Sequence, residues 1–169
     1  MRSSPEDATL ARMERWRIRF EPVLTPVFRT WWRMRRSVTL GVRGVACDSE
    51  GRILLVRHTY APGWHFPGGG VEHGETAVEA VVREMAEEGG VEAIGAPTLL
   101  GFYANHAVFP NDHIALYRID EWRPCASASA NEIAERGFFA LHALPEGVTR
   151  GTRRRIAEIF HGTPQQADW

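Results

Sequence analysis

The chain of 169 residues has no lysine, and arginine supplies all 20 of its basic side chains. It has two cysteines, Cys47 and Cys125, which are far apart and form neither a CxxC pair nor a disulfide framework. No run of 18 apolar residues occurs, and the first residues lack the apolar segment of a signal peptide. These absences predict a cytoplasmic protein with reduced thiols and no transmembrane segment.

An excess of charge of one sign is also missing, because the formal net charge is −1 at pH 7. Such a balance gives no global field for binding nucleic acid or an anionic membrane, so no stable nucleic-acid partner is expected. The hydrophobic content of 44% and the charged content of 24% are ordinary for a soluble globular protein. The length suits one domain with a sizeable core and an appended segment.

Residues 1–36 differ in composition from the rest. Between Arg12 and Arg36 there are eight Arg and two Glu, interleaved with aromatic and aliphatic residues. This pattern predicts an N-terminal helical extension of one or two amphipathic helices, broken near Pro22 and Pro26. Three hypotheses stay open: packing on the domain or on a partner in a homodimer, lying on a membrane surface, or contacting RNA. Aromatic residues at helical spacing are more often buried than exposed, which favours the first.

From residue 37 the hydrophobic period becomes that of strands. Residues 37–47 and 52–58, joined by the turn DSEG, are typical of a β-hairpin. A loop rich in Gly and Pro follows, and a helix is predicted to begin at Thr76, where Thr76 and Glu79 have the spacing of a capping box. Further strands are expected at 98–105, 113–119 and 136–141, and a closing helix at 151–161.

Strands, then a helix, then more strands predict an α/β sandwich around a mixed β-sheet. The predicted organisation is an extension at 1–36, a domain at 37–162 and a C-terminal tail at 163–169.

The end of the first predicted helix carries an unusual charge pattern, in the stretch REMAEEGG. Two glycines end the helix there, so Glu84, Glu87 and Glu88 lie near its partially negative C-terminus. An acid in that position costs about 0.3–1 kcal/mol, and each like-charged pair at a spacing of three or four costs roughly 0.2–0.5 kcal/mol more. A local rule broken in this way is typical of a functional site, and a bound cation would relieve the repulsion.

The kind of cation follows from the ligand chemistry. Carboxylates clustered without His or Cys are hard oxygen ligands, which suit Mg²⁺, Mn²⁺ or Ca²⁺ and not zinc. The alternating acids of a calcium-binding loop are absent from the sequence. Mg²⁺ takes few carboxylates and leaves room for water and substrate phosphates, and Mn²⁺ accepts the same ligands. The sequence therefore predicts a Mg²⁺ site in which Mn²⁺ can substitute.

A family resemblance becomes specific between Gly69 and Val91, where the chain reads GGVEHGETAVEAVVREMAEEGGV. This stretch resembles the Nudix box, G-x5-E-x7-R-E-U-x-E-E-x-G-U with U a bulky apolar residue, at every fixed position. The flanking strands and the later ERGFFALHALP are also similar to the family, so the resemblance covers roughly residues 37–145. It implies a Nudix-type α/β/α sandwich in which the box forms a loop, a helix and a loop.

The resemblance also implies roles for individual residues. Glu84, Glu87 and Glu88 would be metal ligands and catalytic residues, and the carbonyl of Gly68 is a further candidate ligand. One of these glutamates, or a carboxylate from a later loop, would orient or deprotonate the attacking water. Glu132 is the candidate for that distal carboxylate, against the alternative of an ordinary surface acid.

Other residues would support the site or bind the substrate. Glu75 and Arg83 would brace the loop and helix, and Arg83 is expected to pair with Glu79 or Glu87 at a spacing of four.

Candidate substrate-binding side chains lie outside the box. Arg57 is a candidate for contacting phosphate, with a surface position as the alternative. Trp64, Phe66 and Tyr103 are candidates for stacking on a base, with packing in the core or a loop as the stronger alternative for each.

The hypothesis favoured by the complete box is a Mg²⁺-dependent hydrolase that cleaves the phosphoanhydride of a nucleoside diphosphate linked to another group. The attacking group would be a metal-activated water. A Nudix module that binds or senses a nucleotide without turnover is the alternative, and an isomerase of the same fold is a third. The expected partner is a nucleotide-type small molecule. The Pro and Tyr that mark particular subfamilies are not found at the expected distances after the box, so the sequence does not name the substrate.

Overall fold

The computed structural model describes residues 38–128 and 131–169. The predicted N-terminal extension and its proposed role in a homodimer lie outside these residues and stay predictions, as do the predicted domain boundaries. The described part of the chain forms eight strands and two helices. The strands are β1 Thr39–Ala46, β2 Ile53–His58, β3 Trp64–His65, β4 Val91–Ala93, β5 Thr98–Ala104, β6 Asp112–Ile119, β7 Trp122–Pro124 and β8 Ile133–Phe139, and the helices are α2 Ala77–Glu87 and α3 Arg150–His161.

The strands form two three-stranded sheets and one short pair. The first sheet has the order β1-β6-β5 and is mixed, because β1 runs parallel to β6 while β5 runs antiparallel to it. The second has the order β3-β2-β8 and is antiparallel, and β4 pairs with β7. The prediction of an α/β sandwich around a mixed sheet is confirmed.

The predicted β-hairpin of residues 37–47 and 52–58 is wrong in its pairing, although both strands exist. β1 and β2 belong to different sheets, and only an isolated bridge between Cys47 and Ile53 joins them beside the turn. The reason is that both edges of β1 are already occupied. β6 lies along one edge, and the glycine-rich loop lies along the other, where Val42 N–H donates to Gly69 and Val71 N–H donates to Leu40.

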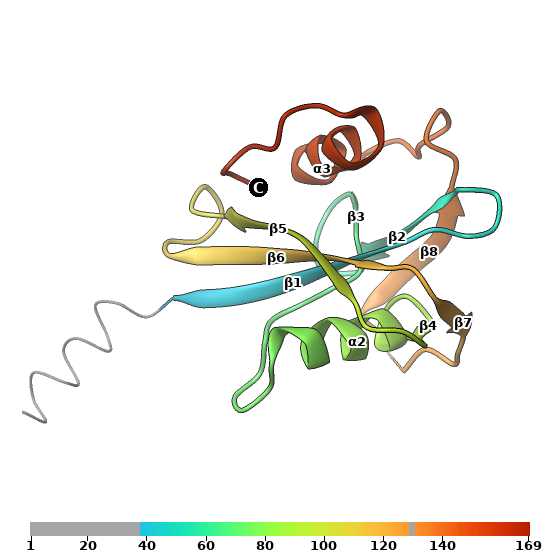
Figure 1. Ribbon diagram of the computed structural model, residues 1–169, viewed down its shortest axis with the longest axis horizontal. Coiled ribbons are helices and arrows are strands. Elements are labelled where there is room, and N and C mark those ends of the chain that lie inside the picture. The colour runs from blue at the N-terminus through green and yellow to red at the C-terminus, as the bar shows by residue number, and fades with distance from the viewer. Residues whose placement is uncertain (1–37, 129–130) are drawn as a thin grey trace, which may run out of the picture. The chain divides into compact units, whose positions relative to one another are not determined.

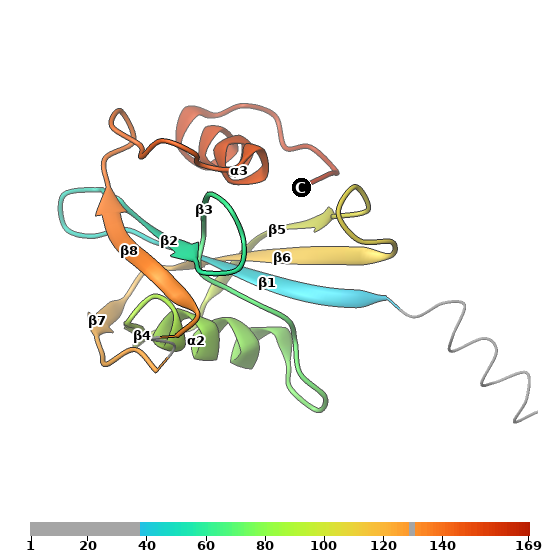
Figure 2. The same cartoon turned by 180° about the vertical axis from the view of Figure 1, so that it is seen from behind.

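The two helices lie on opposite sides of the strands, with α2 on one side and α3 on the other (Figures 1 and 2). Alternate residues of β2 therefore enter different cores, because successive side chains of a strand point to opposite faces. Leu54 packs with Val81 and Met85 of α2, whereas Leu55 packs in the cluster that contains Ile156 of α3. This alternation decides which side chains of β2 can reach the end of α2.

Helix α2 begins as the sequence predicts. Thr76 is its N-cap, with the Thr76 hydroxyl accepting from the Glu79 N–H at 3.2 Å. The Glu79 carboxylate accepts from the Thr76 N–H at 2.8 Å, so the capping box is confirmed. Each such cap contributes about 1 kcal/mol.

Within the described residues, neither helix has the length and apolar character needed to cross a membrane.

The C-terminal residues are packed rather than free. The Ala104 N–H of β5 donates to Ala167 at 2.8 Å, and the Trp169 N–H donates to Ala104 at 2.9 Å. The Trp169 ring meets Tyr103 edge to face, with 5.7 Å between ring centroids. The tail therefore forms one parallel bridge with β5, between Ala104 and Asp168, and its last residue packs against the core under α3.

Candidate active site

The glycine-rich loop before α2 is held against β1 by close backbone contacts. Gly44 N–H donates to Pro67 at 2.9 Å, on the same edge of β1 as the bonds described above. Gly68 has a φ of 144°, and a Cβ there would overlap the carbonyl of Val42. A Cβ on Gly69 would overlap the carboxylate of Glu84. Glycine is therefore required at Gly68, a side chain at Gly69 would displace the Glu84 carboxylate, and the loop backbone lies directly beside the box glutamates.

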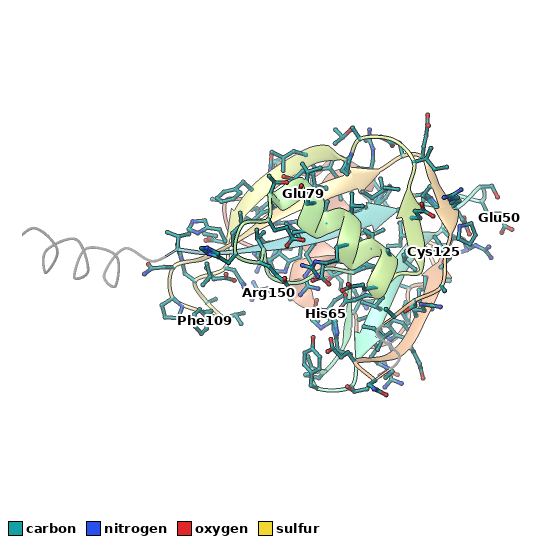
Figure 3. The ribbon with its side chains drawn as sticks, turned by 90° about the horizontal axis from the view of Figure 1, so that it is seen from below. Glu50, His65, Glu79, Phe109, Cys125 and Arg150 are labelled. Atoms are coloured by element: carbon teal, nitrogen blue, oxygen red, sulfur yellow. The ribbon has the colours of Figure 1, made fainter. Side chains whose placement is uncertain are left out.

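The C-terminal end of α2 lies where the sequence predicts it. Glu88 is the C-cap, with its N–H donating to the Glu84 carbonyl at 2.9 Å, and Gly90 has a φ of 66°. Figure 3 views this helix from outside the sheets, with Glu79 labelled in its first turn. Because Glu84 and Glu88 are one turn apart, they project from the same side of the helix toward the loop and β2.

Arg83 holds several carboxylates together. Its Nε donates to Glu75 at 2.9 Å, and its Nη1 donates to Glu84 at 2.7 Å and to Glu87 at 3.3 Å. Its Nη2 also reaches the carbonyl of Gly70 at 3.2 Å. The predicted contact at a spacing of four is confirmed for Glu87, whereas Glu79 is engaged in the capping box. These hydrogen bonds raise the pKa of Arg83, Glu75 being the largest cause, so Arg83 stays charged.

Glu88 is the most deeply buried acid of this group, with 4% of its surface exposed. Its Oε2 accepts from the Gly68 N–H at 2.8 Å, and its Oε1 lies 3.5 Å from Nδ1 of His58. Burial raises the pKa of Glu88 to about 7, with the nearby charges of Glu84 and Glu132 adding to the effect. Burial also lowers the pKa of His58 to about 4, so His58 is neutral at pH 7 and does not compensate the carboxylate.

Glu84 is 8% exposed, and burial is the main cause that raises its pKa as well. Two buried carboxylates therefore share the end of one helix, and Glu87 beside them is 40% exposed. Hard oxygen donors whose buried charge is only partly compensated, by Arg83 and Arg43, fit a divalent cation chemically. Within residues 38–128 and 131–169, however, no three acidic, His or Cys side chains already converge as a metal site. Arg83 donates hydrogen bonds to Glu84 and Glu87 instead. A cation would therefore contact these two carboxylates only after their side chains, or that of Arg83, changed conformation.

Residues 38–159 match the family model of the NUDIX domain. The chain belongs to the Nudix family. An 8-oxo-dGTP diphosphatase of Proteus vulgaris is 33% identical over 99 residues, which cover 55% of this chain and 80% of the relative. An RNA pyrophosphohydrolase of Halorhodospira halophila is 43% identical over 47 residues, 28% of this chain and 26% of that protein. The crystal structure of a MutT Nudix hydrolase from Burkholderia pseudomallei is similar at 27% identity with a TM-score of 0.62, over 73% of this chain and 98% of that one. As a Nudix hydrolase, the chain is a pyrophosphohydrolase acting on acid anhydrides.

The distal acid suggested by the sequence, Glu132, lies near the Nudix glutamates. It comes directly before β8, and its carbonyl accepts from the Thr59 N–H at 2.8 Å just after the end of β2. Its side chain is exposed, and its charge is among those that raise the pKa of Glu88. The structure thus brings Glu132 to the same end of the sheet as the helix terminus.

Arg43 of β1 is a residue of this site that the sequence analysis missed. Its Nη1 donates to the carbonyl of Phe66 at 3.0 Å and to that of Gly68 at 2.5 Å. The Gly68 carbonyl, a candidate metal ligand, therefore already accepts a hydrogen bond in this structure. The positive charge of Arg43 lowers the raised pKa of Glu88 in part. A signal was available, because an arginine inside an otherwise apolar strand is unusual, but its position beside the loop depends on tertiary packing.

Two of the candidate substrate-binding residues, by contrast, lie on the α3 side of the sheets. Trp64 is buried against Phe139, with 4.8 Å between ring centroids. Tyr103 is buried, and its hydroxyl donates to Glu158 of α3 at 3.2 Å.

The other two candidates named from the sequence, Phe66 and Arg57, also contact residues on the α3 side of the sheets. Phe66 is fully buried in the same core, and Arg57 donates to Glu135 on β8 at 2.6 Å while its guanidinium lies 5.9 Å from the Trp64 ring. Packing, the alternative kept open for the aromatic residues, is what the structure shows. The three aromatic rings are buried, whereas the contact of Arg57 with phosphate stays a prediction.

Proposed function

We propose that this Nudix hydrolase depends on a divalent cation and cleaves the phosphoanhydride of a nucleoside diphosphate linked to another group. The observation that carries the proposal is the pair of buried carboxylates, Glu84 and Glu88, beside the backbone of Gly68. Burying two like charges together lowers stability, and a chain that keeps such an arrangement in its family motif has a use for it.

Glu84, Glu87 and Glu88 would hold the cation, with the Gly68 carbonyl and Glu132 as further oxygen ligands. Mg²⁺ is the proposed ion, and Mn²⁺ would substitute because it accepts the same ligands. When bound, the ion would lower the pKa of a coordinated water and neutralise charge on phosphoryl oxygens.

The protein side chains divide the remaining tasks. Arg83, held by Glu75 through two hydrogen bonds of 2.9 and 3.1 Å, positions the carboxylates of Glu84 and Glu87. Glu88, which lies between the Gly68 N–H and His58, is one candidate for orienting or deprotonating the attacking water. Glu132 is the other candidate for that base. The names of the two relatives, an 8-oxo-dGTP diphosphatase and an RNA pyrophosphohydrolase, support a nucleotide-type substrate with a pyrophosphate bond.

The proposal is tested by assaying phosphate and diphosphate release from a nucleotide panel after treatment with a chelator. We expect turnover with Mg²⁺ and Mn²⁺, no need for Zn²⁺, and little turnover with Ca²⁺, whose longer bonds and looser geometry suit this chemistry poorly. A parallel thermal melt should show stabilisation by roughly 2.7 kcal/mol at 100 times the dissociation constant of Mg²⁺.

Two results would contradict the proposal in different ways. Full activity in chelator, with no shift in melting on adding Mg²⁺, would mean that the glutamates serve no metal. Stabilisation by Mg²⁺ and nucleotide without any turnover would instead support a nucleotide-sensing module.

A further inference from the structure

Tyr60 is an exposed aromatic side chain next to the acidic end of α2. It lies in the short segment between β2 and β3, and 70% of its surface is exposed. Single exposed apolar side chains are common on protein surfaces, so what distinguishes Tyr60 is its position beside the acids. The buried rings Trp64, Phe66 and Tyr103 offer no such surface, because they are enclosed in the core under α3.

The ring of Tyr60 is held in place on one side only. It lies against His58, with 5.0 Å between ring centroids and 35° between ring planes. His58 in turn lies 5.6 Å from the ring of His65 and is buried. Figure 3 shows His65, on β3, on the side of the molecule from which α2 is viewed. One face of Tyr60 is thus supported by packed side chains while the exposed fraction leaves the other open to a ligand.

The same contacts place Tyr60 near Glu88 and Glu132. His58, which supports the ring, has its Nδ1 only 3.5 Å from Oε1 of Glu88. Thr59, the preceding residue, donates through its N–H to the carbonyl of Glu132. The His58 ring therefore lies between Tyr60 and Glu88, one of the acids that would hold the cation. A nucleotide also holds its base and its diphosphate apart, with the sugar between them.

We propose that Tyr60 is the stacking platform for the nucleobase of a substrate whose diphosphate lies at Glu84, Glu87 and Glu88. This inference rests on the function proposed above and adds the position of the base. Every base has a flat π-face, so stacking on an exposed ring tolerates different bases and still contributes to affinity. Arg43, between β1 and the loop, supplies positive charge toward the same end of the site.

Partial burial and the neighbouring charges of Glu88, Glu132 and Glu84 raise the pKa of Tyr60. The phenol therefore stays neutral at physiological pH and adds no negative charge beside the phosphates of a ligand.

The test compares ligands with and without a base. Binding to the full chain loaded with Mg²⁺ is measured by calorimetry for methylenediphosphonate and for the α,β-methylene analogues of adenosine, guanosine, cytidine and uridine diphosphate. The variants are Tyr60→Ala and Tyr60→Phe, and the control is Phe109→Ala. Phe109 is also an exposed aromatic, 58% accessible, but it lies in the loop between β5 and β6, whereas Tyr60 lies between β2 and β3. Figure 3 labels Phe109.

Tyr60→Ala should weaken the nucleoside analogue that binds best by roughly 5- to 100-fold, the range for loss of one base–aromatic stack. Its affinity for methylenediphosphonate should not change, and Tyr60→Phe and Phe109→Ala should bind like the wild type. Unchanged nucleotide affinity in Tyr60→Ala would overturn the proposal, and so would an equal loss for the ligand without a base. Since binding is measured without turnover, a protein that fails to hydrolyse any nucleotide still gives a clear answer about Tyr60.

Discussion

Two groups of buried charged side chains lie on opposite sides of the sheets and are built in opposite ways. Under α3, Arg155 is fully buried, and its Nη2 donates to Glu158 at 2.7 Å while its Nη1 donates to the carbonyl of Asp168 at 3.0 Å. Its guanidinium also lies 3.9 Å from the centroid of the Tyr103 ring. Each formal charge in this group has an opposite charge or an aromatic face against it.

At the end of α2 the buried charges are of like sign. Glu84 and Glu88 are both buried, their pKa values are raised, and the neighbouring His58 is neutral. Arg83 compensates Glu84 only from a partly exposed position. A buried charge with its partners contributes to the structure, whereas buried like charges that are only partly compensated are typical of a binding site.

The largest expected effect is on the free energy of unfolding and comes from breaking the buried ion pair of Arg155 with Glu158. Arg155→Met should lower the free energy of unfolding by about 3–5 kcal/mol, because it leaves Glu158 buried without its cation. The measurement is urea denaturation, with Arg154→Met as the control, since Arg154 makes only long hydrogen bonds of 3.4 and 3.5 Å.

Adding Glu158→Gln to Arg155→Met should recover part of the loss, since the orphaned charge is then removed. Catalytic rate per folded molecule should stay unchanged throughout. An Arg155→Met protein as stable as Arg154→Met would show that the ion pair contributes nothing to folding.

Removing an acid at the end of α2 should lower activity without lowering stability, the opposite of the result expected for Arg155. Glu87→Gln and Glu88→Gln should each lose at least ~10²-fold in activity, which is about 2.7 kcal/mol of transition-state free energy. Metal-free stability should stay equal or rise, because a buried or helix-terminal negative charge is removed. In Glu88→Gln the new side-chain amide oxygen would still accept from the Gly68 N–H, so the loop contact is preserved.

Glu92→Gln is the matched control, because Glu92 pairs with Arg123 at 2.8 Å on an exposed surface. It should leave activity unchanged and have little effect on stability, because an exposed ion pair contributes little. Wild-type activity in both Glu87→Gln and Glu88→Gln would end the interpretation of this cluster as a metal site.

The smallest effect is a pH dependence of stability in the metal-free protein. The pKa of Glu88 is raised from 4.5 to about 7 in the folded state, so the folded chain binds more protons than the unfolded chain between those values. Stability should therefore fall as pH rises through that window, with a slope of up to about 1.4 kcal/mol per pH unit.

His58 acts in the opposite direction over an overlapping window. Its pKa falls from 6.5 to about 4 on folding, so its contribution to stability rises with pH between these values. The contribution of Glu88 is therefore read as the difference between wild type and Glu88→Gln in chelator, by urea denaturation at several pH values. A difference that stays flat from pH 4.5 to 7 would show that Glu88 titrates normally.

Much of the α2 side could be predicted because its signals are local. The capping box at Thr76, the two glycines after Glu88 and the contact of Arg83 with Glu87 all act within one or two helical turns. Backbone geometry alone brings residues three and four apart together, so spacing in the sequence is enough to predict such contacts. The positions of most strands follow in the same way from a period of two.

Only the tertiary structure decided which strands pair and on which face of a sheet each side chain lies. β1 pairs with β6, with Thr39 opposite Asp112, and this parallel partner cannot be inferred from local spacing. The same packing turns Trp64 and Tyr103 toward α3 and brings Tyr60 to the acids instead. Register and the choice of face depend on which distant surfaces are buried together, because a shift of one residue moves every side chain of a strand to the other face. The sequence by itself determined the acidic helix end and its family motif, and the assembled sheets decided which side chains surround it.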